Sequence, residues 1–301
     1  MDDQVRFATD LYRGTAGYYD RYRLPYPEAM TTDLIRRSRA SGHGRLLDLA
    51  CGTGQLAFPL RPWFTGVWAV DREPDMVEAV RRKAAAAGAG EVRAAVSDAE
   101  RLDAEPGYFE LVVIGNAFHR LDRDLTAARV LRWLSPGGCL ALCWSSSPWA
   151  GGEDWQRALS AVVDRWRAAL GAGHRVPAGW DAARQRRPDA RVLSEAGFEA
   201  AGRYEFTAGH RWSLPELAGH VRSTSVLPPA VLGGHAAAFD ADLAASLGPY
   251  GDGGVFTETV SFAYDLARKP AGRTREGDRA AASAGAAVAL QQLPVDPPAL
   301  G

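Results

Sequence analysis

The sequence contains few cysteines and no long apolar segment. Its three cysteines are too few, and odd in number, for a disulfide framework, which favours a reducing cytoplasmic location. No apolar run approaches the ~20 residues that a helix needs to cross a bilayer. Residues 1–4 show neither the positive charge nor the apolar stretch of a signal peptide. We therefore expect a cytoplasmic protein with no membrane partner.

The sequence also lacks an excess of charge of either sign. Its 35 basic and 36 acidic residues are interspersed and leave a net charge of −1, so we expect no nucleic-acid partner. Its six histidines show no metal-ligand spacing and no nearby cysteine cluster, so we expect no metal. Neither a Gly-x-Ser-x-Gly elbow nor a Gly-Lys-Ser/Thr phosphate loop is present.

What is present is an apolar strand pattern that ends in a carboxylate and a glycine turn. Residues 45–56 read Arg-Leu-Leu-Asp-Leu-Ala-Cys-Gly-Thr-Gly-Gln-Leu, and α/β sheets bind nucleoside cofactors at the carboxyl ends of such strands. Gly52-x-Gly54-x-x-Ala57 loosely fits the dinucleotide fingerprint, which is a weak pattern by itself. A carboxylate at Asp48 would repel a pyrophosphate but suits a cofactor that carries an ammonium and a sulfonium. The turn therefore favours S-adenosylmethionine over NAD.

Further strand patterns follow, and two of them also end in carboxylates. Asp71 stands about 20 residues after Gly52, the spacing of the acidic residue that binds a ribose diol. Asp98 lies in an acidic loop that can accept a hydrogen bond from an adenine amino group. Helix-length segments separate the strands, which indicates βαβ units and a parallel sheet. The strand patterns after residue 56 are 66–71 and 139–144 and, each together with the loop that follows it, 92–100 and 109–119.

With these residues in place, the chain resembles the class I S-adenosylmethionine-dependent methyltransferases, and within them a small-molecule subgroup. Arg120 departs from that subgroup, which often has Trp at this position and so places an aromatic ring there. In the subgroup's N-terminal lid, a Tyr and an Arg close over the methionine end of the cofactor. The segments that carry the resemblance are 48–54, 70–76, 97–100 and 134–138 for the family, and 18–27 and 116–119 for the subgroup.

The resemblance implies an α/β fold with a Rossmann-like seven-stranded, mostly parallel sheet, helices on both faces and an inserted helical cap. Helical spacing predicts helices over 152–170 and 213–225, and alternation predicts strands over 201–212 and 255–266 that pair antiparallel. Residues 171–189 are rich in Gly, Pro and Arg and predict a loop. The expected regions are an N-terminal lid (1–40), a cofactor core (41–150), a substrate cap with the last two strands (151–268) and a disordered tail (269–301).

The same reasoning assigns candidate site residues. His119 is the candidate catalytic residue, as a general base; the alternative is that it hydrogen-bonds a backbone carbonyl and positions its loop. The candidate substrate residues are Tyr22, His119, Trp144, Trp212 and Ser225. The candidate cofactor residues are Tyr19, Arg23, Asp48, Ala50, Cys51, Gly52, Gly54, Gln55, Asp71, Arg72, Met76, Ser97, Asp98, Ala99, Asn116 and Ala117.

We expect a methyltransferase that moves the methyl group of S-adenosylmethionine to an oxygen or nitrogen of a small-molecule acceptor. The resemblance and the variable second half suggest secondary metabolism, such as antibiotic biosynthesis, in a monomer or homodimer. Three alternatives stay open: a non-methylating reaction that keeps the cofactor, a partner-binding scaffold, and an NAD dehydrogenase, which Asp48 disfavours. Fold alone does not choose among them.

Overall fold

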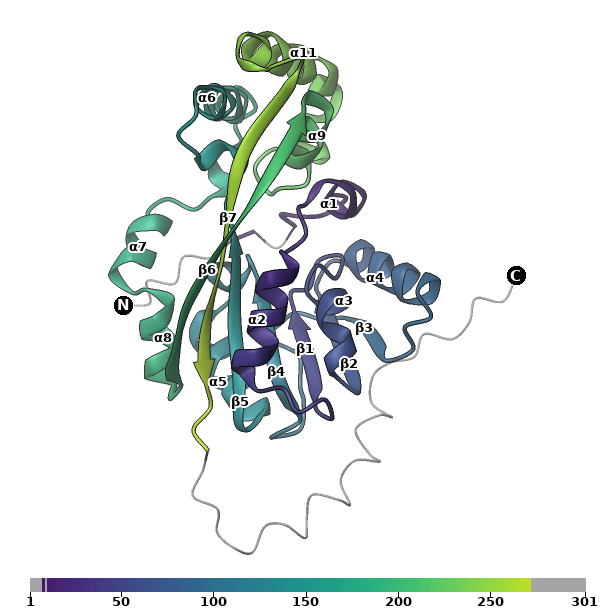
Figure 1. Cartoon of the computed structure of the whole chain (residues 1–301). Helices are drawn as coiled ribbons and strands as arrows, with labels where there is room; N and C mark the ends of the chain where they lie inside the picture. The colour runs from purple at the N-terminus through teal and green to yellow at the C-terminus, as the bar shows by residue number, and fades with distance from the viewer. Residues whose placement is uncertain (1–6, 9, 272–301) are drawn as a thin grey trace, which may run out of the picture.

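The computed structural model describes residues 7–8 and 10–271, which form an α/β fold around one seven-stranded sheet (Figure 1). The strand order is β3-β2-β1-β4-β5-β7-β6; the first five strands are parallel, and β7 pairs antiparallel with β5 and with β6. This sheet confirms the expected Rossmann-like architecture. The strands are β1 (Arg45–Leu49), β2 (Gly66–Asp71), β3 (Val92–Val96), β4 (Phe109–Gly115), β5 (Leu134–Ser145), β6 (Glu199–Ser213) and β7 (Val255–Arg268).

Helices cover both faces of the sheet because the central strands are apolar on both sides. On one face Met30 and Val80 pack with Leu46 of β1, and on the other Trp133 and Val192 pack with Leu47 of β1. None of the described helices is both long and apolar enough to span a bilayer. The helices packed around the sheet are α2 (Glu28–Ser38), α3 (Ala57–Leu60), α4 (Pro74–Ala86), α5 (Arg123–Trp133) and α8 (Asp189–Ala196). Two further helices, α1 (Ala16–Tyr22) and α7 (Trp180–Arg186), precede α2 and α8 in the chain.

A third apolar core lies beyond the sheet, where β6 and β7 extend past the end of β5 (Figure 1). Trp212 near the end of β6 and Phe256 near the start of β7 pack there with Leu159, Leu217 and Phe239. The helices around this core, which we call the cap, are α6 (Asp154–Ala169), α9 (Leu214–Arg222), α10 (Pro229–Leu232) and α11 (Ala236–Leu247).

Local sequence explains where several helices begin and end. Ser213 caps α9: its hydroxyl accepts a hydrogen bond from the Glu216 backbone, and the Glu216 carboxylate returns to the Ser213 backbone nitrogen at 2.8 Å. Gly197 ends α8 with a φ of 103°. Pro59 lies inside α3, which ends after four residues.

Two helical segments depart from the sequence-based expectations. The predicted loop over 171–189 contains α7, which is a correction to that prediction. Helices α10 and α11 were not predicted; α11 is rich in alanine, and its buried Phe239, Leu243 and Leu247 give only a weak helical periodicity. Of the expected tail, Lys269 continues the pairing beside β5 by donating its backbone N–H to Gly138 at 2.9 Å. Residues 272–301 lie outside the described residues, and the expected region boundaries stay predictions.

Candidate functional site

A cavity of about 390 Å³ opens at the carboxyl ends of β1 to β4. The strand order changes direction between β1 and β4, and α/β sheets bind ligands at such a point. The loops after β1 to β5 form one part of its wall. The segment from Phe7 to Arg23, helix α7 and the residues after α9 form the rest. The volume lies within the range of small-molecule sites.

Two carboxylates accept hydrogen bonds that fix the backbone of the glycine turn at the floor of the cavity. The Asp71 carboxylate accepts the Gly52 backbone N–H at 2.8 Å, and the Asp48 carboxylate accepts the Ala57 backbone N–H at 2.8 Å. Gly52 and Gly54 adopt φ values of 54° and 87°, which favour glycine. Asp48 is 1% exposed and lies beneath the turn, outside the cavity lining, and burial raises its pKa to about 7.

Carboxylates gather on one side of the cavity, which we call the acidic end: Asp71, Glu73, Asp98 and Glu100. Burial raises the pKa of Asp71 and of Glu73, and Asp71 raises that of Glu73 further. The second oxygen of Asp71 accepts the Glu73 backbone N–H at 3.0 Å, so the carboxylate is held in one orientation. Arg72 pairs with Asp98 at 3.0 Å across the mouth of the turn.

A second group of lining residues, which we call the basic end, consists of Tyr12, Arg23, His119, Arg120 and Ser225. Arg120 donates to the Tyr12 hydroxyl and, at 3.4 Å, to the Ser225 hydroxyl. Burial raises the pKa of Tyr12, but Arg120 and Arg23 outweigh it, so the net pKa lies below the usual value. A positive potential therefore dominates this end of the cavity.

His119 stands within a group of aromatic side chains at the basic end. Its ring lies 5.3 Å from Trp180, 5.8 Å from Trp144 and 6.1 Å from Phe7, measured between centroids. Burial, with Arg120, Arg184 and Arg123, lowers the pKa of His119 to about 2, so the imidazole is neutral at physiological pH. Its Nδ1 atom is buried without a hydrogen bond to any described residue.

Asn116 supports the floor between the two ends. It adopts a φ of 49°, which Asn tolerates better than most residues. Its side-chain nitrogen donates to Ser145 at 2.9 Å and to Tyr26 at 3.3 Å, and its oxygen accepts the Ser145 backbone N–H at 3.2 Å. These bonds tie the end of β4 to β5 beneath the cavity.

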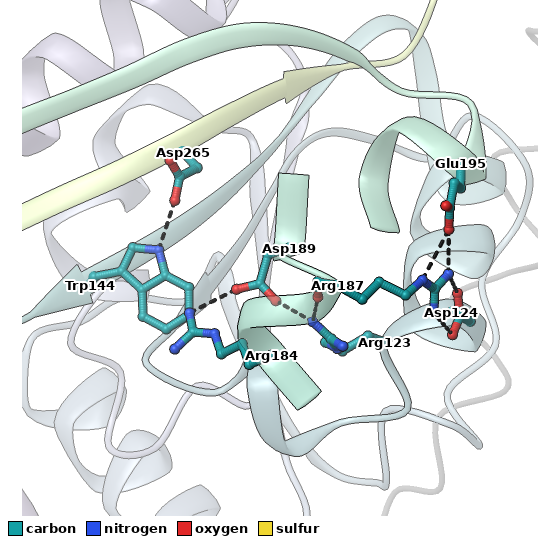
Figure 2. A network of polar contacts seen from close by, with 8 residues as sticks. All are labelled: Arg123, Asp124, Trp144, Arg184, Arg187, Asp189, Glu195 and Asp265. Atoms are coloured by element: carbon teal, nitrogen blue, oxygen red, sulfur yellow. Dashed lines mark hydrogen bonds and ion pairs between the residues drawn. The ribbon is translucent and has the colours of Figure 1, made fainter. Parts of the chain in front are cut away.

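A network of ion pairs joins α7 and α8 to Arg123 and Asp124 of α5 (Figure 2). Asp189, which is 8% exposed, accepts from Arg123 at 2.9 Å and from Arg184 at 2.8 Å. The Arg184 guanidinium lies 4.5 Å from the centre of the Trp144 ring, and the Trp144 indole donates to Asp265 at 3.0 Å. The network thereby positions Trp144 against His119.

The structure brings most of the candidate residues to the cavity. Trp144 contacts His119 but is not in the lining, and Trp212 lies in the cap core with its indole nitrogen 2.6 Å from Glu258. Tyr22 packs against Gly219 of α9, outside the cavity lining. Candidates outside the lining are Tyr22, Asp48, Cys51, Gly54, Gln55, Trp144 and Trp212; those in it are Tyr19, Arg23, Ala50, Gly52, Asp71, Arg72, Met76, Ser97, Asp98, Ala99, Asn116, Ala117, His119 and Ser225.

Sequence reasoning missed several lining residues. Phe7 and Tyr12 precede the segment that resembled a lid, and Trp180 lies in the segment predicted as a loop. Glu73, two residues after Asp71, had a signal in its position within the acidic motif. Arg120 was noticed as a departure from the subgroup, but the sequence does not show that it faces the cavity.

Residues 46–138 match the sequence profile of a family described as a methyltransferase domain. An uncharacterized methyltransferase of Mycobacterium tuberculosis is 31% identical over 155 residues, which are 51% of this chain and 59% of the relative. A demethylmenaquinone methyltransferase of Thermus thermophilus is 40% identical over 101 residues, 33% of this chain and 46% of the relative. The chain therefore spans only about half the length of these curated relatives.

Solved structures share the fold at low sequence identity. A protein of Anaeromyxobacter dehalogenans, provisionally named a type II methyltransferase, aligns with a TM-score of 0.53 and 22% identity over 83% of this chain and 98% of its own. The [4+2]-cyclase SpnF aligns with a TM-score of 0.50 and 21% identity over 88% of this chain and 93% of its own. These likenesses show the fold, and the family match supports class I S-adenosylmethionine-dependent methyl transfer.

Proposed function

Because residues 46–138 match a methyltransferase domain, we propose that this protein transfers the methyl group of S-adenosylmethionine to an oxygen or nitrogen of a small-molecule acceptor. One observation carries the proposal. The same cavity contains the acidic end, beside the glycine turn, and the group of aromatic side chains around His119. We also propose a role in secondary-metabolite tailoring, such as antibiotic biosynthesis, in the cytoplasm. The resemblance of the N-terminal segment and the separate cap support that role.

The residues of the acidic end fit S-adenosylmethionine. Asp71 has lone pairs left after its two backbone bonds, and they can accept the hydroxyls of a ribose diol. A Cβ at Gly52 would stand 3.0 Å from the Tyr19 ring, so glycine lets this ring of the N-terminal segment pack directly against the turn. We propose that Asp98 and Ala99 contact the adenine, together with Met76, which lines the same cavity.

The cofactor, when bound, supplies a methyl group already activated by its sulfonium, so the protein mainly has to align the acceptor and exclude water. Alignment contributes ~7–11 kcal/mol in well-oriented reactions. Phe7, Trp180 and Tyr19 surround the space above the turn and restrict water. His119 is neutral and its Nδ1 has no described partner, so it can accept a hydrogen bond from the acceptor heteroatom and hold it in place. A pKa of about 2 makes it a weak general base, so this positioning role is the one we propose for it.

The experiment that tests this proposal is calorimetric titration of S-adenosylmethionine and S-adenosylhomocysteine, followed by turnover. We expect micromolar binding of both ligands and, with acceptor screens, formation of S-adenosylhomocysteine. Binding without turnover on any acceptor would favour a non-methylating reaction, which the [4+2]-cyclase of the same fold keeps open. If the folded protein binds neither ligand, the proposal is wrong and a partner-binding scaffold is favoured. Binding of NADH alone would indicate a dehydrogenase.

A further inference from the structure

The basic end of the cavity contains more positive charge than the described residues neutralise. Arg23 and Arg120 both line the cavity, and neither forms an ion pair with a carboxylate of residues 7–8 or 10–271. Arg23 donates to the Ser223 backbone carbonyl at 3.4 Å, and Arg120 donates to the hydroxyls of Tyr12 and Ser225. The Nε atom of each guanidinium is buried without a partner in this part of the chain. Buried charge of this kind is costly unless a ligand pairs with it.

The two arginines occupy different places. Arg23 lies 4.9 Å from the centre of the Tyr19 ring, and that ring faces Gly52 of the turn. Arg120 contacts different side chains: it lies 4.9 Å from the Tyr12 ring, which is 6.2 Å from the Tyr19 ring, and 5.9 Å from the Phe7 ring, and it reaches Ser225 after α9. Arg23 is therefore the guanidinium next to the proposed cofactor. The methionine carboxylate of that cofactor can neutralise one guanidinium, so Arg120 is left for another anion.

The walls around Arg120 are aromatic. Phe7 and Trp180 stand edge to face at 5.9 Å, His119 lies 5.3 Å from Trp180, and Trp149 lines the same cavity. Such walls suit a flat apolar ring. The Arg120 fork and the Ser225 hydroxyl together offer donors to a planar, singly charged group.

We propose that the methyl acceptor is an aromatic carboxylic acid whose carboxylate binds Arg120 and Ser225 and whose ring lies among Phe7, Trp149 and Trp180. The inference rests on the proposed function, because it takes the acidic end as the cofactor site. The lowered pKa of Tyr12, with burial outweighed by Arg120 and Arg23, agrees with a positive potential where the carboxylate would bind. Arg120 thus determines specificity at the position where the subgroup often has an uncharged Trp.

The test is calorimetry on the full chain saturated with S-adenosylhomocysteine, with benzoate and 4-hydroxybenzoate as probes. We expect benzamide and 4-hydroxybenzamide to bind at least tenfold more weakly, because the amide lacks the charge that pairs with Arg120. Arg120→Gln should weaken both acids about 10–100-fold and leave S-adenosylhomocysteine affinity within about twofold. Arg120→Lys should recover only part of the loss, since a lysine cannot form the bidentate fork.

Two matched variants separate the roles. Arg23→Gln should weaken S-adenosylhomocysteine but not 5′-methylthioadenosine, which lacks the methionine carboxylate, and Arg211→Gln, an exposed arginine outside this cavity, should change nothing. Each variant is first shown to keep the melting temperature of the wild type.

The contrary outcomes are distinct. If Arg120→Gln weakens S-adenosylhomocysteine as much as the acids, Arg120 binds the cofactor and the inference fails. Tighter binding of phenyl phosphate than of benzoate would assign the site to phosphate esters instead. Equal binding of acids and amides, or no binding of any acid to the loaded protein, would also overturn the inference while leaving the proposed function intact. Failure of S-adenosylhomocysteine itself to bind would overturn the proposed function, whatever the acids do.

Discussion

The two ends of the cavity are built in different ways. The acidic end comes from the loops that follow β1, β2 and β3, and its central carboxylate, Asp71, is held by the backbone N–H groups of Gly52 and Glu73 in those loops. The basic end comes from distant parts of the chain: the N-terminal segment, the loop after β4, α7 and the residues after α9. Its side chains are held mainly by other side chains, as in the Arg120–Tyr12 and Arg184–Asp189 contacts.

This difference indicates which end of the cavity can change its chemistry by substitution. An end made of backbone and strand termini keeps its shape as long as the sheet forms, which suits a cofactor that does not change. An end made of side chains from separate segments can change its charge with one substitution, which suits an acceptor that differs between proteins. Tyr19 is influenced by charged groups of both ends. Its pKa is raised to about 12, mainly by burial; Tyr12 and Asp71 raise it further, and Arg23 opposes the shift.

The largest expected effect is the loss of the acidic end through Asp71→Ala. The substitution removes the acceptor proposed for the ribose and the bond that orients Gly52, so S-adenosylhomocysteine affinity should fall at least ~100-fold. Titration calorimetry measures the change. Asp103→Asn, at an exposed ion pair with Arg132, is the control and should bind as the wild type does. Unchanged affinity in a folded Asp71→Ala protein would remove the acidic end from the cofactor site.

Breaking the attachment of the basic end should cost stability. Asp189→Asn removes the buried charge that holds Arg123 and Arg184, and we expect the free energy of unfolding to fall by about 1–3 kcal/mol, because two partly buried cations lose their charged partner. Urea unfolding measures it. Glu195→Gln alters exposed pairs with Arg187 and Arg191 in the same network and should change stability far less (Figure 2). Equal losses in both variants would argue against a special role for Asp189.

The same contrast explains what sequence reasoning reached. The strand, turn and carboxylate of residues 45–56 lie within one segment, so their pattern predicted the turn and its place at the sheet edge. Asp48 was expected to face the cofactor, but its depth beneath the turn depends on the bond to Ala57, which no pattern shows. That Asp48 contributes to cofactor binding stays a prediction, and it would do so by supporting the turn.

At the basic end the sequence contained the residues but not their arrangement. Trp212 lies in a segment with the alternation of a sheet strand. However, β6 and β7 extend past the end of β5, and this places Trp212 in the cap core. Helix α7 has few buried apolar residues and depends on Arg184 pairing with Asp189, a contact that local periodicity does not encode. Tyr12 and Arg120 meet across 108 positions, and only the fold brings them together.

The pKa of His119 reports on burial and on positive charge at the basic end. Its folded-state pKa of about 2 lies below the unfolded value near 6.5, so the unfolded chain binds more protons as the pH falls below 6.5. Stability from this group is therefore present above pH 6.5 and lost on acidification, by about 2 kcal/mol between pH 7 and 5. His119→Gln should remove that part of the slope in denaturant unfolding at the two pH values. Parallel pH dependence in both proteins would show that His119 is not held neutral.

The smallest expected effect is at Gly52, where the two ends meet. Gly52→Ala puts a methyl 3.0 Å from the Tyr19 ring and forces alanine to a φ of 54°, so S-adenosylhomocysteine affinity should fall about tenfold. Gly88→Ala is the matched control, because Gly88 has a φ of 60° but no atom within 4 Å of an added Cβ. Both variants should lose about 1–2 kcal/mol of stability from backbone strain, but only Gly52→Ala should lose affinity. An equal affinity in the two variants would mean that the contact between the turn and Tyr19 does not shape the cofactor site.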